Sequence, residues 1–229
     1  DDVARRNVTW EQIVEHTAVV LAFGGMALKN SRVASGGISR HIERESMRQA
    51  AARGCRFINI SPLSSDFPAD AQADWVQAVP GTDVALMLAL VHELVAQGWH
   101  DEVFLAEFCE GWQDFQDYLS GRHDGQAKNA AWAAPICGVP EAKIAELARR
   151  LCGKRVLVTV AHSLQRAEHG EQPVWMAAVL AAALGQLGLP GGGYAYALGT
   201  LAHYGKRSNA VPVASLPQGV NGVLSLIHI

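Results

Sequence analysis

Short apolar runs alternate with helix-like stretches along the chain, in the order that an α/β fold requires. Four runs of β-branched and other apolar residues are typical of buried parallel strands, at residues 17–23, 55–61, 75–79 and 155–161. Between the first two lies a charged stretch of helix formers, residues 38–54, that ends at a glycine. Strand, helix and strand in this order predict a βαβ unit with a right-handed crossover.

Helix signals recur in the rest of the chain. Residues 83–98 begin with Asp83 and end at a glycine, and residues 139–153 carry Pro140 in their first turn. Residues 171–188 are apolar nearly all round, which predicts a helix buried on almost every side. Shorter helices are expected at residues 101–109, 114–119 and 129–137.

Together these elements predict an α/β fold, with a mostly parallel, Rossmann-like sheet flanked by helices. After residue 161 the strand pattern gives way to the long apolar helix and a glycine-rich, sheet-poor stretch. We therefore expect a domain boundary near residues 168–170. A Rossmann-like α/β domain would span residues 1–168, and part of a second α/β domain would span residues 169–223.

Composition narrows the class of protein. The 229 residues are 49% hydrophobic and 18% charged with a formal net charge of -3, which indicates a globular chain and argues against a basic nucleic-acid groove. No uninterrupted apolar run reaches the length of a membrane span. The four cysteines are far apart and form no C-x-x-C pair, so we expect free thiols. His92-Glu93 lacks the second histidine of a zinc motif, and we predict no metal-ligating residue.

Both ends indicate that the sequence is an internal piece of a longer protein. It starts without an initiator methionine or an apolar signal segment. Its last six residues, LSLIHI at 224–229, match no upstream pattern and resemble the translated end of an adapter used in DNA library preparation. We expect these six residues to be non-native; the alternative is a native exposed strand.

Polar and glycine-rich segments follow each of the four predicted strands, at residues 23–30, 60–65, 80–83 and 161–166. In open parallel sheets, ligands bind beyond the carboxyl ends of the strands. Backbone N–H groups and hydroxyls suit phosphate, and a carboxylate suits the amino group of a base. The four segments therefore predict a site for a nucleotide-like ligand.

Each segment also fits an ordinary structural role. Gly24 and Gly25 can simply turn the chain out of a strand, and the cluster at residues 64–66 can be a turn or cap. Asp83 can be a first-turn helix acid, and Gln165 can be a surface residue. The prediction of a site therefore depends on the coincidence of four strand ends.

A nicotinamide-binding domain is the obvious rival, and the residues count against it. After the first strand the glycines stand at 24, 25, 36 and 37, which is not G-x-G-x-x-G. The second strand ends in Ser61 rather than in the acid that would hold a ribose. The phosphate-binding motif G-x-x-x-x-G-K-[ST] is also absent.

Two long segments carry a family resemblance. Residues 80–140, from PGTDVALMLALVHELVAQG onward, resemble the molybdopterin oxidoreductases of the dimethyl sulfoxide reductase family. They are most like the branch with trimethylamine N-oxide and biotin sulfoxide reductases. Residues 164–193, ending in PGGG, resemble the family's segment before its pterin-binding core. The resemblance extends to residue 223 and implies a cofactor of molybdenum with two molybdopterin guanine dinucleotides.

The resemblance assigns cofactor-binding roles to the first two strand-end segments. The family has a W-G-x-N-P-like loop where this chain has Phe23, Gly24 and Gly25, and Asn30 is the candidate for the missing amide. The family's I-D-P-x-x-S loop falls on Ser61, Pro62 and Ser65, with serine replacing the acid. Loss of that carboxylate weakens the case for a ribose or guanine contact at Ser61.

The other two strand-end segments match unequally. Gly81, Thr82 and Asp83 agree well with the family, and Asp83 would accept hydrogen bonds from a guanine edge. In the fourth segment, the family's G-W-G-M-Q-R corresponds here to A-H-S-L-Q-R. Gln165 and Arg166 are retained, while His162 in the tryptophan position implies an altered pocket.

The three glycines at 191–193 exceed what a helix end requires. The resemblance implies that Gly191, Gly192 and Gly193 let the backbone approach the cofactor where a Cβ would intrude. A flexible turn between elements is the alternative.

The resemblance implies an enzyme that reduces an S-oxide or N-oxide by oxygen-atom transfer, with this chain as a cofactor-binding part. In that branch a serine upstream of the first nucleotide-binding loop ligates molybdenum, so we assign no catalytic residue here. The implied electron donor is a protein such as a c-type cytochrome or a thiol system, and both periplasm and cytoplasm stay open. The alternatives are a nucleotide-binding module of another enzyme and a non-catalytic scaffold domain.

Overall fold

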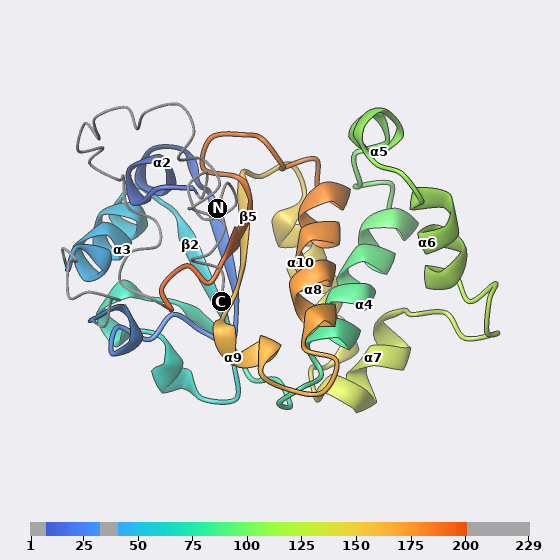
Figure 1. Ribbon diagram of the computed structural model, residues 1–229, viewed down its shortest axis with the longest axis horizontal. Coiled ribbons are helices and arrows are strands. Elements are labelled where there is room, and N and C mark those ends of the chain that lie inside the picture. Colours follow the sequence, from blue (N-terminus) through green and yellow to red (C-terminus); the bar gives the residue numbers. More distant parts are fainter. Residues whose placement is uncertain (1–7, 33–40, 201–229) are drawn as a thin grey trace, which may run out of the picture.

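A parallel five-stranded sheet forms the centre of the molecule. The computed structural model describes residues 8–32 and 41–200 (Figure 1). The strands lie in the order β3 (Asp74–Val76), β2 (Arg56–Ile60), β1 (Val19–Phe23), β4 (Val156–Val160) and β5 (Gly193–Tyr196), and every neighbouring pair is parallel. The predicted fold class is therefore confirmed.

The central strand β1 determines where the site can form. Phe23, its last residue, is level with Ile60 of β2 and Val160 of β4, so three strands end together. After β1, the next two strands, β2 and β3, lie on one side of it, and the last two, β4 and β5, lie on its other side. The gap between β1 and β4 is thus the topological switch point, where α/β folds bind ligands.

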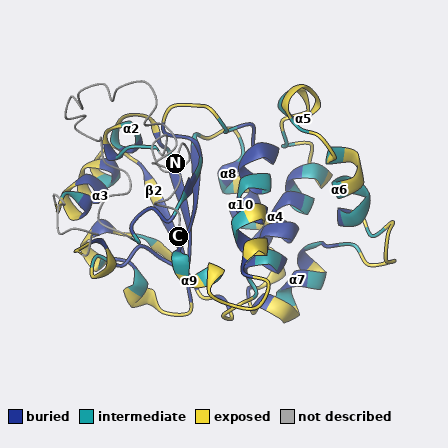
Figure 2. Cartoon of the chain, in the orientation of Figure 1, coloured by how far each residue is buried: buried dark blue, intermediate teal, exposed yellow. Residues whose placement is uncertain are grey.

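One face of the sheet is covered by α4 (Asp83–Ala96), α8 (Glu141–Leu151) and α10 (Glu171–Ala183) (Figure 1). Their inner sides are buried against the strands (Figure 2). Leu90, Leu147 and Leu180 are examples of fully buried residues there. Further from the sheet lie α5 (Glu102–Phe108), α6 (Trp112–Leu119) and α7 (Ala130–Cys137).

The opposite face carries a smaller apolar core. It is covered by α2 (Trp10–His16) and α3 (Glu43–Ala52), whose Trp10 and Met47 are buried with Phe57 of β2. Short helical turns complete the described chain at η1 (Asn30–Arg32), η3 (Ser64–Asp66), η4 (Ala69–Ala71) and α9 (His162–Gln165). Three of these four follow β1, β2 and β4, close to the predicted site segments.

The predicted domain boundary near residues 168–170 needs correction. The helix after it, α10, belongs to the same apolar core as α4 and α8. The next strand, β5, pairs with β4 over four residues and extends the same sheet. Residues 169–200 therefore continue the first domain. The rest of the predicted second domain (201–223) and the tail (224–229) lie outside the described residues.

Two predicted elements differ in detail. The third strand is Asp74–Val76 rather than 75–79, because β3 pairs with β2 over three residues only. The long apolar helix ends at Ala183, and it is not buried all round, since Trp175 is 65% exposed. The strand β5 was not predicted, because its four residues lack the β-branched side chains that mark the other strands.

Candidate ligand site at the carboxyl edge of the sheet

The segment after β1, which we call the first loop (residues 23–30), is held on both sides. The Gly24 N–H donates to the carbonyl of Ile60 over 2.8 Å, and the Ala161 N–H donates to the carbonyl of Phe23 over 2.9 Å. Gly24 and Gly25 have φ of +80° and +76°, which favours glycine. The first loop is thus fixed between the ends of β2 and β4.

The two glycines also bring the loops into contact. A Cβ on Gly24 would stand 2.4 Å from Leu164 Cδ1 in the segment after β4. A Cβ on Gly25 would stand 2.6 Å from the carbonyl oxygen of Asp66 in the segment after β2. Three of the four predicted segments therefore meet at the switch point. Asn30, at the far end of the first loop, begins η1 and is exposed.

The second loop (residues 60–66) is organised around Ser61, which is 1% exposed. Its carbonyl accepts a hydrogen bond of 2.9 Å from Trp75 Nε1. Its hydroxyl donates to the carboxylate of Asp66 and accepts from the Leu63 N–H. Pro62 and Ser65 are exposed on the outside of this loop.

The third loop (residues 79–83) lies at the same edge, which is the lower edge of Figure 1, and is tied to α7. The Val79 N–H donates to the carbonyl of Cys137 over 2.9 Å. Thr82 closes a turn on the carbonyl of Val79, through its N–H at 3.3 Å and its hydroxyl at 2.6 Å. Gly81 has φ +78° at the third position of this turn, after Pro80, as a type II turn requires.

Asp83 is the first residue of α4, and its side chain is 9% exposed. Burial raises the pKa of its carboxyl group from the ordinary 3.8 to about 6, although its own backbone N–H favours the charged form. A buried carboxylate at this edge has a strong need for hydrogen-bond donors. This makes Asp83 the most perturbed acid in the described part of the candidate site.

The fourth loop (residues 161–166) contains the single-turn helix α9. The ring of His162 meets the ring of Tyr196 edge-on, with centroids 4.9 Å apart at an interplanar angle of 72°. The Tyr196 hydroxyl donates to Gln165 Oε1 over 3.3 Å. Arg166 follows the turn and is exposed. The end of β5 therefore supports a loop whose position a helix this short cannot fix by itself.

Gly191, Gly192 and Gly193 lie elsewhere. Gly191 and Gly192 directly precede β5 and Gly193 begins it, so all three stand at the amino edge of the sheet, opposite the four loops. A Cβ on Gly191 would stand 2.7 Å from the carbonyl oxygen of Gln12, and the Gly191 carbonyl accepts a bond of 2.5 Å from the Thr17 hydroxyl. Close packing on the chain itself explains why this segment lacks side chains, and the segment does not lie with the four loops.

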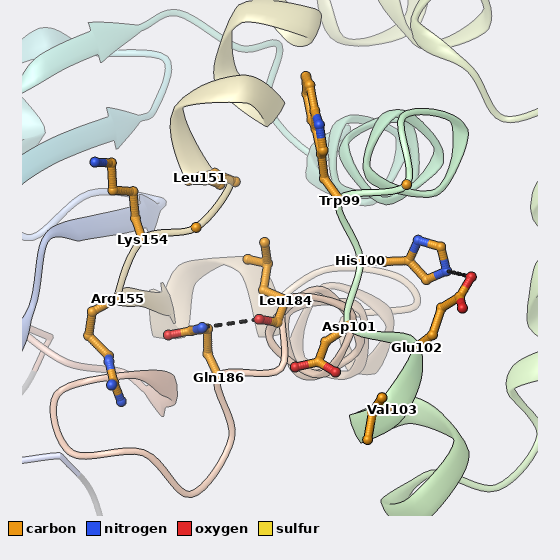
Figure 3. Close-up of a pocket in the computed structure, with 12 residues that line it drawn as sticks. Trp99, His100, Asp101, Glu102, Val103, Leu151, Lys154, Arg155, Leu184 and Gln186 are labelled. Atoms are coloured by element: carbon orange, nitrogen blue, oxygen red, sulfur yellow. Dashed lines mark hydrogen bonds and ion pairs between the residues drawn. The ribbon is translucent and has the colours of Figure 1, made fainter.

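A cavity of about 770 Å³ opens at this amino edge (Figure 3). Lys154 and Arg155 lie on one side of it, and His100, Asp101 and Glu102 lie on the other. None of the predicted site residues lines it.

Three further observations concern the described residues only. They include no group of three or more histidine, cysteine, aspartate or glutamate side chains that could hold a metal ion. No helix in the described ranges is both long and apolar enough to cross a membrane. The four cysteines are free thiols, as predicted.

Comparison with protein families identifies the chain. The family model for molybdopterin oxidoreductases matches residues 3–222. The chain belongs to the molybdopterin oxidoreductase family. Its members carry a molybdenum–molybdopterin cofactor, so a nucleotide-binding module of an unrelated enzyme is no longer an alternative.

Curated relatives of this molybdopterin oxidoreductase fall in the expected branch. It is 43% identical to biotin sulfoxide reductase of Cereibacter sphaeroides over 86% of the chain, and 38% identical to trimethylamine-N-oxide reductase of Haemophilus influenzae over 93%. A dimethyl sulfoxide/trimethylamine N-oxide reductase of Cereibacter sphaeroides is 37% identical over 84%. The chain spans about a quarter of the length of these relatives, at 26%, 25% and 23%.

A solved structure shares the fold. Acetylene hydratase from Pelobacter acetylenicus superposes with a TM-score of 0.63 over 81% of this chain and 24% of that chain, at 18% sequence identity. At this level of identity the likeness concerns the fold alone.

Two residues at this edge escaped sequence reasoning. Asp66 was grouped with an ordinary turn, yet its carboxylate is hydrogen-bonded by Ser61. Tyr196 lies on the strand that was not predicted, and it contacts both His162 and Gln165. An alternating Y-A-Y after the glycines was the available signal for Tyr196.

Proposed function

We propose that this chain binds the guanine dinucleotide part of a molybdenum bis(molybdopterin guanine dinucleotide) cofactor. The observation that carries the proposal is the meeting of the first, second and fourth loops at the switch point between β1 and β4. This is where parallel α/β sheets bind nucleotides. Family membership supplies the pterin, and the geometry supports a nucleotide attached to it.

The residues at this edge fit such a group. Gly24 and Gly25 carry no Cβ, so the loops after β2 and β4 can close against the first loop and bring their polar groups to one place. The same three loops carry exposed polar side chains, with Arg166 suited to phosphate and Ser65, Gln165 and Asn30 to hydroxyl and phosphate oxygens. Pro62, Thr82 and Gly81 complete the lining as turn residues, and Phe23 is buried beneath it.

Asp83 is the residue that gives the site its preference for guanine in this proposal. A charged carboxylate accepts two hydrogen bonds at once, and a guanine edge offers two neighbouring N–H donors. Pairing with those donors would offset the burial that raises the pKa of Asp83. Adenine has a single amino group on that edge next to an acceptor, so it would leave one carboxylate oxygen facing a lone pair.

The complete protein, we propose further, reduces an S-oxide or N-oxide. Its relatives are named for biotin sulfoxide, trimethylamine N-oxide and dimethyl sulfoxide. The metal cofactor supplies the redox and oxygen-atom chemistry, while this chain binds and orients it and limits access of water. A donor protein, such as a c-type cytochrome or a thiol system, would provide the electrons.

Nucleotide selectivity tests the proposal directly. The complete protein is purified from a host that cannot make molybdopterin, and binding of GDP and of inosine diphosphate is measured by calorimetry. Inosine lacks the exocyclic amino group, so it should bind roughly tenfold or more weakly than GDP. Asp83→Asn should remove most of that difference. Failure of GDP to bind, or equal binding of both nucleotides, would overturn the proposal.

Cofactor content gives a second test in the loaded protein. Asp83→Asn should lower the guanine and molybdenum content after purification. Glu93→Gln is a suitable control, because Glu93 lies near the far end of the same helix. If Asp83→Asn retains as much guanine as the control, Asp83 is only a first-turn helix residue.

A further inference from the structure

Asp66 stands at the junction of the first and second loops. Its carbonyl accepts a hydrogen bond of 2.8 Å from the Met26 N–H, and its own N–H donates to Leu63 over 3.2 Å. The side chain is half-buried, and one carboxylate oxygen, Oδ2, accepts the hydroxyl of Ser61. Main chain and side chain are thus both fixed, which makes Asp66 a rigid group rather than a surface acid.

The position of this carboxylate has a chemical meaning. In doubly wound folds an acid at the end of the second strand accepts hydrogen bonds from a ribose hydroxyl of the nucleotide. Here the residue directly after β2 is Ser61, which is 1% exposed and cannot play that part itself. The turn η3 brings the chain back so that the carboxylate of Asp66 reaches Ser61.

Ser61 leaves the carboxylate able to bind more. Two carboxylate oxygens offer about four acceptor positions, and the Ser61 hydroxyl uses one of them. Ser61 is oriented in turn, because its own oxygen accepts the Leu63 N–H at 3.3 Å. The serine therefore holds the acid in place instead of replacing it.

We propose that Asp66 accepts a hydrogen bond from a ribose hydroxyl of the bound nucleotide, with Ser61 as its positioning residue. This assignment rests on the proposed function, since it concerns the same nucleotide. It restores to the second loop the carboxylate that the sequence lacks at position 61. It also distributes recognition over the edge, with the base at Asp83 and the sugar at Asp66.

Deoxynucleotides test the assignment. The cofactor-free complete protein is titrated with GDP, 2′-deoxy-GDP and 3′-deoxy-GDP. At least one deoxynucleotide should bind the wild-type protein roughly tenfold more weakly than GDP, as expected for one hydrogen bond to a charged group. In Asp66→Asn the ratio of GDP affinity to deoxynucleotide affinity should fall towards one, while the ratio of GDP affinity to inosine diphosphate affinity is unchanged. Ser61→Ala should reduce the ribose ratio partially.

Asp70→Asn is the matched control. Asp70 lies four residues further on and pairs with Arg44 at 3.1 Å on the surface, so its substitution should leave the ribose ratios at wild-type values. Thermal unfolding of each variant shows whether a change in ratio accompanies a loss of fold. The role of Asp66 would be overturned if Asp66→Asn kept the wild-type ratios of GDP to deoxynucleotide affinity, or if the deoxynucleotides bound as well as GDP. Either result would leave the proposed function standing. Absence of GDP binding by the wild-type protein would instead overturn the proposed function.

Discussion

Gly24 and Leu164 approach each other so closely that a Cβ on Gly24 would stand 2.4 Å from Leu164 Cδ1. The same Cβ would stand 2.8 Å from the Cβ of Ala161. This contact joins the loop after β1 to the loop after β4 across the switch point. A glycine is required there for two separate reasons, a positive φ and the absence of space.

Gly24→Ala should therefore destabilise the protein by about 2–4 kcal/mol, since it adds steric overlap to the cost of a left-handed backbone. Gly81→Ala is the control, because Gly81 has φ +78° with no atom within 4 Å of an added Cβ. It should cost only about 1–2 kcal/mol. Urea unfolding measures both. Adding Leu164→Ala should recover part of the loss in Gly24→Ala and none in Gly81→Ala.

Asp83→Asn should stabilise the ligand-free protein at pH 7.5. Burial raises the pKa of Asp83 from 3.8 to about 6, so its charged form destabilises the fold, and this effect develops as pH rises from about 4 to 6. The corresponding free energy is about 3 kcal/mol at most, and loss of a first-turn acid offsets up to ~1 kcal/mol of the gain. Unfolding at pH 7.5 should show a more stable variant, with the advantage nearly absent at pH 4. A variant that is less stable at pH 7.5 would contradict this account.

The affinity for GDP should weaken as the pH falls, whereas the stability of the ligand-free protein should increase. A protonated Asp83 presents one donor and loses an acceptor, so GDP affinity should fall as pH drops below about 6. The affinity of Asp83→Asn should be flat over the same range. Parallel titration with inosine diphosphate separates this effect from protonation of the phosphates, which both nucleotides share.

The glycines at the amino edge should affect folding and leave nucleotide binding alone. Gly191→Ala combines φ +68° with contacts of 2.7 Å to Gln12 and 2.9 Å to Thr17, so a loss of about 2–4 kcal/mol is expected. Gly192→Ala meets mainly Arg155 Cδ, which can move, and should cost below ~1 kcal/mol. A Gly192→Ala protein of normal stability that binds GDP poorly would return this segment to the ligand site.

Tyr196→Phe should weaken GDP binding about two- to tenfold, because it removes the hydrogen bond that orients Gln165. Tyr194→Phe is a matched control on the same strand, since the Tyr194 hydroxyl is buried without a hydrogen-bond partner in the described part of the chain. The control should bind normally and be as stable as wild type or more so. Combined with Gln165→Ala, Tyr196→Phe should have little further effect. If the double variant instead lost GDP affinity by the product of the two single losses, Tyr196 would not act through Gln165.

Local sequence was sufficient for β1, β2 and β4 and for the loops that follow them. Each of these strands is rich in apolar, mostly β-branched residues and is bounded by glycine or polar residues, and parallel connections place their carboxyl ends at one edge. The location of Gly24, Ser61, Asp83 and Gln165 at that edge followed from this rule.

Contacts between segments that are distant along the chain could not be predicted from local sequence. The strand order decides that the first loop touches the second and the fourth, and nothing near Gly25 in the sequence indicates Asp66. The same limit applies to the three glycines, because the neighbours of Gly191, Gln12 and Thr17, lie near the other end of the chain. The strand β5 was missed because its stability comes from pairing with β4 and cover by α10.

The pairing of β1 with β4 has a consequence for synthesis of the protein. Val19 pairs with Val156, so the two halves of the proposed nucleotide site are separated by most of the described chain. Such long-range pairings form late in folding, after the loops that separate them have closed. On the ribosome, the first and second loops must wait until residues beyond Arg166 have emerged. Insertion of the cofactor should therefore follow translation of this region, and the nascent chain up to β3 should have no affinity for it.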